Sequence, residues 1–213
     1  MDTIIRFFQE GGPFMFPIGV ILAVGLAVTL ERFIFLAREK SSNRRSFEEV
    51  LPMLQKRDFR AALNYTNSSD AKIAIIFSAG INRRPSGRRD DIELAMEEGV
   101  MEAIPQLEKR TQYIATLANI ATLMGLLGTI MGLISAFTAV ANAAPADKAT
   151  LLSQSISVAM NTTAFGLMAA IPLLLCHTFL QTKTNEIIDS IEMAGVKFLN
   201  IVTERKPGSN KEG

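Results

Sequence analysis

Two long uncharged stretches of this chain, residues 111–146 and 149–182, carry small and hydroxyl side chains among their apolar residues. The first contains Asn119, Thr122, Gly125, Gly128, Thr129, Gly132 and Ser135, and the second contains Ser153, Ser155, Ser157, Asn161, Thr162, Thr163 and Gly166. Helical spacing places positions 122, 125, 129 and 132 on one face, and positions 155, 159, 162, 163 and 166 on another. In lipid, such faces serve either close helix contact or a water-lined surface.

Packing of small residues alone accounts for the glycines, namely Gly125, Gly128, Gly132 and Gly166. It accounts less well for the consecutive Asn161, Thr162 and Thr163, because polar side chains at membrane depth need partners or water. We therefore interpret the polar residues as a functional lining and the glycines as helix-packing positions.

The two stretches contain no Asp, Glu, Lys or Arg, so this chain offers no intramembrane carboxylate as a proton carrier. The single ionisable candidate is His177, for which an interfacial or packing role fits better than a proton relay. The sequence shows no nucleophile with a base, no metal-ligand cluster and no phosphate-binding loop. It predicts neither a catalytic site, nor a metal site, nor an organic cofactor.

The composition and the distribution of charge indicate which kind of element carries these residues. The chain has 213 residues, 48% of them hydrophobic, with 22 Lys and Arg against 21 Asp and Glu. This near-zero net charge argues against nucleic-acid binding. The uncharged stretches 11–30, 111–146 and 149–182 each reach the roughly 20 residues that a helix needs to cross a bilayer. The sequence therefore predicts an integral membrane protein that contacts lipid.

Charge asymmetry predicts how the spans are oriented. Basic residues follow the first span, at Arg32, Arg38, Lys40, Arg44 and Arg45, whereas the connection between the second and third spans has only Lys148. The positive-inside rule then places the N-terminus on the outer side of the membrane and the C-terminus on the inner, cytoplasmic side. Acidic residues before the first span, and Glu31-Arg32 after it, favour a retained anchor over a cleaved signal peptide.

We expect an all-α, polytopic protein with three transmembrane helices, of which the long second and third protrude into a cytoplasmic helical bundle. The expected segments are a periplasmic or interfacial start (1–12), transmembrane helix 1 (13–36), a cytoplasmic helical segment (37–110), transmembrane helix 2 (111–142), a periplasmic turn (143–150), transmembrane helix 3 (151–182), a C-terminal cytoplasmic helix (183–204) and a disordered tail (205–213).

Three motifs carry a family resemblance. They are Leu117-Ala118-Asn119-Ile120-Ala121, then Leu126-Leu127-Gly128-Thr129-Ile130-Met131-Gly132-Leu133 with Ala136-Phe137, then Thr162-Thr163-Ala164-Phe165-Gly166-Leu167-Met168-Ala169-Ala170-Ile171-Pro172. With them the sequence resembles the MotA/TolQ/ExbB proton-channel family over nearly its whole length. The three-span layout is similar to the ExbB/TolQ branch.

The resemblance implies an inner-membrane homopentamer around a dimer of a single-span partner of the ExbD/TolR type, whose intramembrane Asp carries the coupling ion. Ion flow then drives movement of one component within the other, and work is done across the periplasm, with a TonB-like or other periplasm-spanning protein as a further partner. Thr129 and Thr163 match the family's pore threonines, and Thr162 and Asn161 are weaker candidates by adjacency.

One position departs from the family, because ExbB and TolQ commonly carry a Glu early in span three where this chain has Val158. The coupling ion therefore stays open: H⁺ by resemblance, or Na⁺, which a hydroxyl-rich lining would also suit. Two other functions also stay open. One is a non-conducting scaffold whose inner bundle recruits a cytoplasmic partner, and the other is a membrane enzyme that depends on His177.

Overall fold

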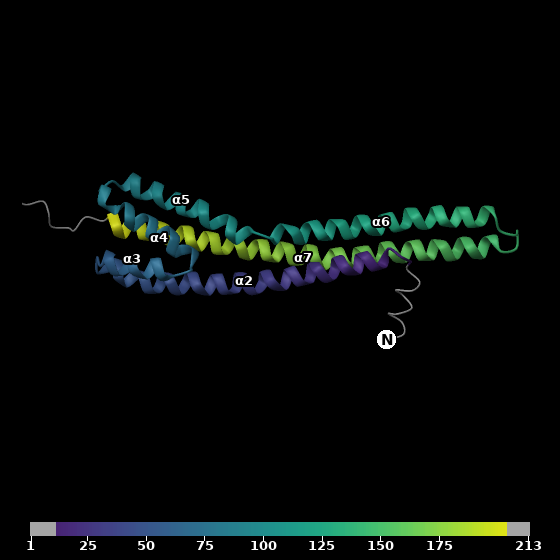
Figure 1. Cartoon of the computed structure of the whole chain (residues 1–213), viewed down its shortest axis with the longest axis horizontal. Helices are drawn as coiled ribbons and strands as arrows, with labels where there is room; N and C mark the ends of the chain where they lie inside the picture. The colour runs from purple at the N-terminus through teal and green to yellow at the C-terminus, as the bar shows by residue number, and fades with distance from the viewer. Residues whose placement is uncertain (1–11, 204–213) are drawn as a thin grey trace, which may run out of the picture. The chain divides into compact units, whose positions relative to one another are not determined.

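The computed structural model of this chain describes residues 12–203, which are mostly helical and include no β-strand. The helices are α2 (Met15–Gln55), α3 (Phe59–Ser68), α4 (Lys72–Arg83), the short η1 (Arg84–Ser86), α5 (Arg89–Glu108), α6 (Thr111–Ala141) and α7 (Lys148–Thr203) (Figure 1). The expected start segment up to residue 11 and the expected tail at 205–213 lie outside the described residues.

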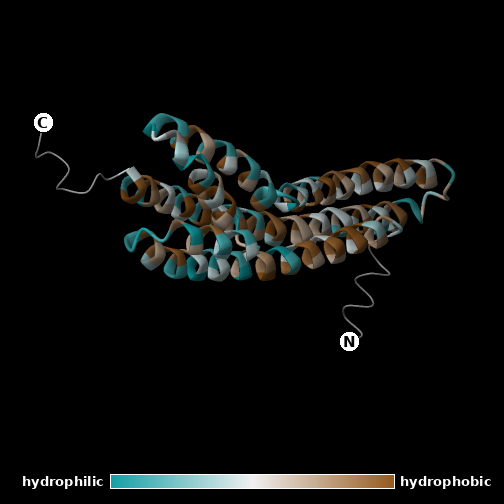
Figure 2. Cartoon of the chain, turned by 60° about the vertical axis from the view of Figure 1, so that its left-hand side comes forward, coloured by the Kyte–Doolittle hydropathy of each residue, from teal (hydrophilic) through white to brown (hydrophobic). Residues whose placement is uncertain are grey.

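Three helical segments are long and apolar enough to cross a membrane, within Met15–Gln55, Arg89–Ala141 and Lys148–Thr203. In Figure 2 the apolar colour runs along α6 and the first parts of α2 and α7, and the polar colour is concentrated on the rest of α2 and on the shorter helices. This confirms the prediction of an all-α chain with three candidate membrane spans and long second and third spans.

Two helices continue through positions where the sequence analysis placed segment boundaries. Helix α2 passes residues 36–37 and α7 passes residues 182–183 without a break. Neither residues 26–51 nor residues 173–194 contain Gly or Pro, so nothing in the backbone chemistry ends the helix there. The residues of α2 and α7 change from apolar to charged at these positions, but the helices themselves continue.

The chain divides into two compact units, each of which combines segments distant in sequence. The span unit comprises the chain up to Arg32 together with Arg110–Leu180, and the bundle unit comprises Phe33–Lys109 together with the chain from Gln181. The long helices α2 and α7 each contribute to both units. Between α5 and α6 the chain turns at Arg110, which adopts a left-handed conformation with φ of 71°.

The bundle unit has an aromatic core formed by three helices. The ring of Phe77 on α4 stacks on that of Phe198 on α7, with centroids 4.8 Å apart, and Phe47 on α2 lies 6.2 Å from Phe77. Turn-forming residues interrupt the helices of this unit at 67–70 and 83–87, where α3 ends at Ser68 and Gly87 takes a φ of 69°. The side chain of Asn43 accepts a 3.0 Å hydrogen bond from the backbone N–H of Ile73, near the start of α4.

Candidate functional site

The helices α6 and α7 approach each other closely within the span unit, through glycine on both sides. A Cβ atom added at Gly166 would lie 2.8 Å from the carbonyl oxygen of Ala121 and 3.0 Å from the Cα of Gly125. Both neighbours are backbone atoms, so they cannot move without displacing α6. Small residues in membrane helices permit this approach, because dispersion contacts and interhelical hydrogen bonds hold such helices together.

The other two predicted packing glycines lie further along the same contact. Gly128 faces the side chain of Thr162, which fills the space that a Cβ would need, and a Cβ at Gly132 would lie 2.7 Å from the Cβ of Ala159. All four glycines therefore lie where α6 meets α7.

Thr163 bridges the two helices. Its Oγ1 donates a 2.8 Å hydrogen bond to the carbonyl oxygen of Gly125 on α6, and its side chain is half-buried. In an α-helix that carbonyl also accepts the amide proton of the residue four positions later, which is Thr129. The geometry thus ties Thr163 to the helical turn that presents Thr129.

Thr129 is half-buried, and its Oγ1 donates a 2.6 Å hydrogen bond to the Leu126 carbonyl oxygen of its own helix. The lone pairs of both threonine hydroxyls remain available to accept a hydrogen bond or to coordinate a cation. We define these two residues as the threonine pair. At membrane depth such a pair offers an ion or a protonated carboxyl group a polar surface.

Thr162 occupies a different position from the threonine pair. Its side chain is 2% exposed, and its Oγ1 donates a 3.0 Å hydrogen bond to the Val158 carbonyl oxygen. It lines a cavity of about 270 Å³ that is also bounded by Ser135, Ser155 and the residues just before α2. Val158, where the resemblance would place a Glu, lines the same cavity.

Asn161 does not share a face with Thr163. Residues two positions apart in an α-helix, such as Asn161 and Thr163, are separated by about 200° around the axis, so their side chains project in nearly opposite directions. Thr163 is tied to α6 by its hydrogen bond, whereas Asn161 is half-buried elsewhere on α7. The four candidate lining residues therefore do not form one surface: Thr163 bonds to α6 one turn before Thr129, Thr162 faces Gly128, and Asn161 projects away from Thr163.

His177 is the only ionisable side chain in the uncharged part of α7, residues 149–182, apart from the thiol of Cys176. Its Nε2 atom is buried and makes no hydrogen bond within the part of the chain that the structure describes. It lies 14 residues beyond Thr163, which is about 21 Å along the helix. The threonine pair thus has no titratable group of this helix beside it.

Sequence reasoning missed the position of Arg32, which counted there only as a cytoplasmic charge. The structure buries its side chain in the span unit, with 2% exposed, and its Nε donates a 3.1 Å hydrogen bond to Thr111 Oγ1 at the start of α6. Next to it Glu31 forms a 3.3 Å ion pair with Arg110. The charge pair Glu31-Arg32 thus links the end of the first span to the beginning of the second.

We expect Thr111→Val to destabilise this junction, because it removes an acceptor from a buried guanidinium group. Hydrogen bonds to charged groups contribute about 1.5–3 kcal/mol each, so the melting temperature of the purified chain should fall by several degrees. Thr116→Val is the matched control, since that exposed hydroxyl bonds to the Gln112 carbonyl of its own helix. Equal melting temperatures for the two variants would contradict a structural role for Arg32.

Comparison with known proteins places this geometry in a family. The profile of the MotA/TolQ/ExbB proton channel family matches residues 68–193, which include α6, the threonine pair and most of α7. An ExbB biopolymer transport homolog of Methanothermobacter thermautotrophicus is 25% identical over 193 residues, which cover 90% of this chain and 67% of that protein.

Two further relatives match over shorter lengths. The biopolymer transport protein ExbB of Aquifex aeolicus is 30% identical over 112 residues, or 53% of this chain and 74% of that protein. The Tol-Pal system protein TolQ of Haemophilus influenzae is 34% identical over 93 residues, or 44% of this chain and 40% of TolQ.

Proposed function

The chain belongs to the MotA/TolQ/ExbB proton channel family, in its ExbB/TolQ-like branch, and we propose that it is the channel subunit of an ion-driven motor in the bacterial inner membrane. The observation that carries this proposal is the threonine pair, where the Thr163 hydroxyl bonds to the α6 backbone beside Thr129 at membrane depth. A polar surface in a stretch without carboxylates suits a pathway whose titrating group comes from another protein.

The partner in this proposal is a single-span protein of the ExbD/TolR type that carries an intramembrane Asp. Five copies of this chain surround two copies of the partner, with the N-terminus in the periplasm and the C-terminus in the cytoplasm. The proposal is supported by the names of the relatives, which belong to the ExbB and Tol-Pal transport systems, and by the basic residues that follow the first span. A TonB-like or other periplasm-spanning protein would receive the work.

The proposed mechanism uses the change of charge at the partner's Asp. When that carboxyl group is neutral it can donate a hydrogen bond to a threonine hydroxyl and move past apolar side chains at low cost. When it ionises, desolvation makes apolar contact costly, so it prefers the hydroxyls and water at the threonine pair. Each change of protonation therefore shifts the preferred position of the partner within the ring.

The coupling ion in this proposal is H⁺, and a Na⁺-driven version is the alternative. Two hydroxyls and nearby backbone carbonyls are oxygen ligands that a hard cation also accepts. The cavity beside Val158 has serine and threonine hydroxyls but no carboxylate among its lining residues. Ion flux under separate pH and Na⁺ gradients distinguishes the two ions.

Gradient-driven flux tests the proposal. The chain and its genomic neighbour are co-expressed, reconstituted in liposomes, and given a pH gradient or a Na⁺ gradient separately. We expect flux of one ion that exceeds that of liposomes holding this chain alone, and the gradient that produces it names the ion. If an intact complex passes neither ion under either gradient, the result would favour a non-conducting scaffold.

A further inference from the structure

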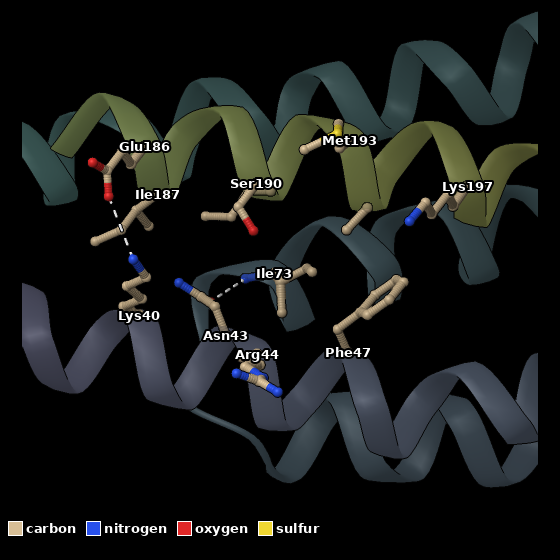
Figure 3. A pocket seen from close by; sticks show the side chains of 12 residues that line it. Lys40, Asn43, Arg44, Phe47, Ile73, Glu186, Ile187, Ser190, Met193 and Lys197 are labelled. Atoms are coloured by element: carbon tan, nitrogen blue, oxygen red, sulfur yellow. Dashed lines mark hydrogen bonds and ion pairs between the residues drawn. The ribbon is translucent and has the colours of Figure 1, made fainter. Parts of the chain in front are cut away.

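A separate cavity of about 200 Å³ lies within the bundle unit, between α2 and α7, with the start of α4 beside it (Figure 3). Isoleucine, alanine, methionine and phenylalanine side chains make up its apolar part. Its polar lining residues are Lys40, Asn43, Arg44, Glu186, Ser190 and Lys197. This cavity contains none of the residues used in the proposed ion pathway.

Asn43 has an unused hydrogen-bond donor in this cavity. Its side chain is 5% exposed, and its Oδ1 is occupied by the backbone N–H of Ile73 at 3.0 Å. Its Nδ2 atom is buried and makes no hydrogen bond within residues 12–203. Figure 3 shows this amide nitrogen directed into the space between α2 and α7. A buried donor without an acceptor is destabilising, and a ligand that brings an acceptor oxygen would remove that cost.

The cationic side chains around the cavity outnumber the carboxylates. Lys40 Nζ lies 3.4 Å from Glu186 Oε2 and Arg44 Nε lies 2.9 Å from Glu48 Oε1. Lys197 forms no ion pair with a described residue, and its Nζ lies 5.9 Å from the centre of the Phe47 ring. One full positive charge at the rim is therefore left for an anion.

Glu186 is the one carboxylate that lines the cavity, and it is already engaged. The hydrogen bond from Lys183, assisted by the one from Lys40, holds the pKa of its carboxyl group below the usual value, although partial burial opposes the shift. Glu186 therefore stays ionised and bound to two lysines at neutral pH. It neutralises Lys40 rather than Lys197, whose ammonium group lies at the other end of the cavity.

We propose that this cavity binds the phosphate group of a phosphate ester, whose carbon chain lies against the apolar part of the lining. A phosphate offers several acceptor oxygens to the Asn43 amide on α2 and the Ser190 hydroxyl on α7, and the Lys197 ammonium group at one end of the cavity attracts its negative charge. The cavity is smaller than the 300–1,000 Å³ of typical drug-sized sites, so it suits a head group rather than a nucleotide.

The phosphate can come from an anionic phospholipid or from a soluble ester. Lys40 lies four residues, about 6 Å along the helix, beyond Leu36 at the end of the apolar part of α2. The polar layer of a bilayer has a similar thickness on each side of the hydrocarbon, so lipid phosphate is within reach of this end of the cavity. The same donors would accept a soluble phosphate ester from the aqueous side.

The experiment uses the full chain, purified with its partner, in two arms. In the first, glycerol 3-phosphate is titrated by calorimetry into nanodiscs of phosphatidylcholine. In the second, native mass spectrometry counts phosphatidylglycerol molecules retained from nanodiscs of equal phosphatidylglycerol and phosphatidylcholine. Binding in the first arm alone assigns a soluble ester, and retention in the second alone assigns a lipid. Both arms measure binding alone, so their results do not depend on whether the complex conducts ions.

Two variants test the residues. Asn43→Asp keeps the acceptor for the Ile73 N–H but replaces the donor by a carboxylate, and Lys197→Gln removes the unpaired charge without filling the cavity. We expect each to weaken binding at least tenfold, and Lys56→Gln, an exposed lysine away from the cavity, to leave it unchanged. If Asn43→Asp fails to fold, Lys197→Gln decides alone. Absence of binding in both arms, or equal binding by wild type and the folded variants, overturns the proposal.

Discussion

Replacing Thr163 by valine is expected to abolish the ion-driven output of the complex while the chain still folds and assembles. Valine has nearly the shape of threonine, so the contact between α6 and α7 keeps its packing. It cannot donate to the Gly125 carbonyl oxygen, and it removes one of the two hydroxyls of the threonine pair. In the proposed mechanism the ionised Asp of the partner then has no adequate polar surface at this depth, and the output should fall to the level without a gradient.

The measurement is the work output of cells that carry each variant at equal expression, together with ion flux in liposomes. Thr163→Ser should keep a large part of the wild-type output, because it retains the hydroxyl. Thr178→Val is the matched control, since that exposed hydroxyl bonds to the Leu174 carbonyl of its own helix. Wild-type output from Thr163→Val would show that the hydroxyl takes no part in the pathway.

Gly166→Ala is expected to destabilise the span unit and to stop ion-driven output, although it adds only one methyl group. The added Cβ would lie 2.8 Å from the Ala121 carbonyl oxygen and 3.0 Å from the Gly125 Cα, so α6 and α7 must separate. Overpacking of this kind costs about 1–3 kcal/mol, more than the roughly 1 kcal/mol that alanine gains over glycine in helix propensity. The shift would also pull Thr163 away from the Gly125 carbonyl.

Melting temperature in detergent and the amount of assembled complex measure this effect. Gly195→Ala is the control, because its Cβ would meet only the terminal methyl of Met96 at 3.4 Å, which can rotate away. The two substitutions therefore have opposite expected signs: a lower melting temperature at position 166 and an equal or higher one at position 195. A stabilised Gly166→Ala variant would mean that the helices do not approach through this glycine.

The sequence was sufficient to predict most of the fold, because uncharged length and helical periodicity reflect local chemistry. It could not locate the ends of α2 and α7, since the charged residues after each span are as compatible with helix as the apolar residues before them. The breaks at residues 67–70 and 83–87 were predictable from their turn-forming residues, which act on the backbone directly.

The candidate site was predictable only in part. The helical period places Gly125 and Thr129 on one face of α6, but the hydrogen bond between Thr163 and Gly125 depends on the register of α7 against α6. Adjacency suggested Asn161 as a lining residue beside Thr163, although residues two positions apart in a helix project about 200° from each other. The burial of Arg32 is set by the start of α6, which lies 79 residues away.

Cysteine cross-linking to the partner tests the central claim most directly. In a Cys176→Ser background, the partner's intramembrane Asp is replaced by Cys and paired with Thr129→Cys, Thr163→Cys or Asn161→Cys. Disulfides require Cα atoms within about 7 Å, so they report contact at membrane depth. We predict disulfides to positions 129 and 163 but not to position 161. Cross-links to position 161 alone would place the partner on another face of α7 and contradict the role of the threonine pair.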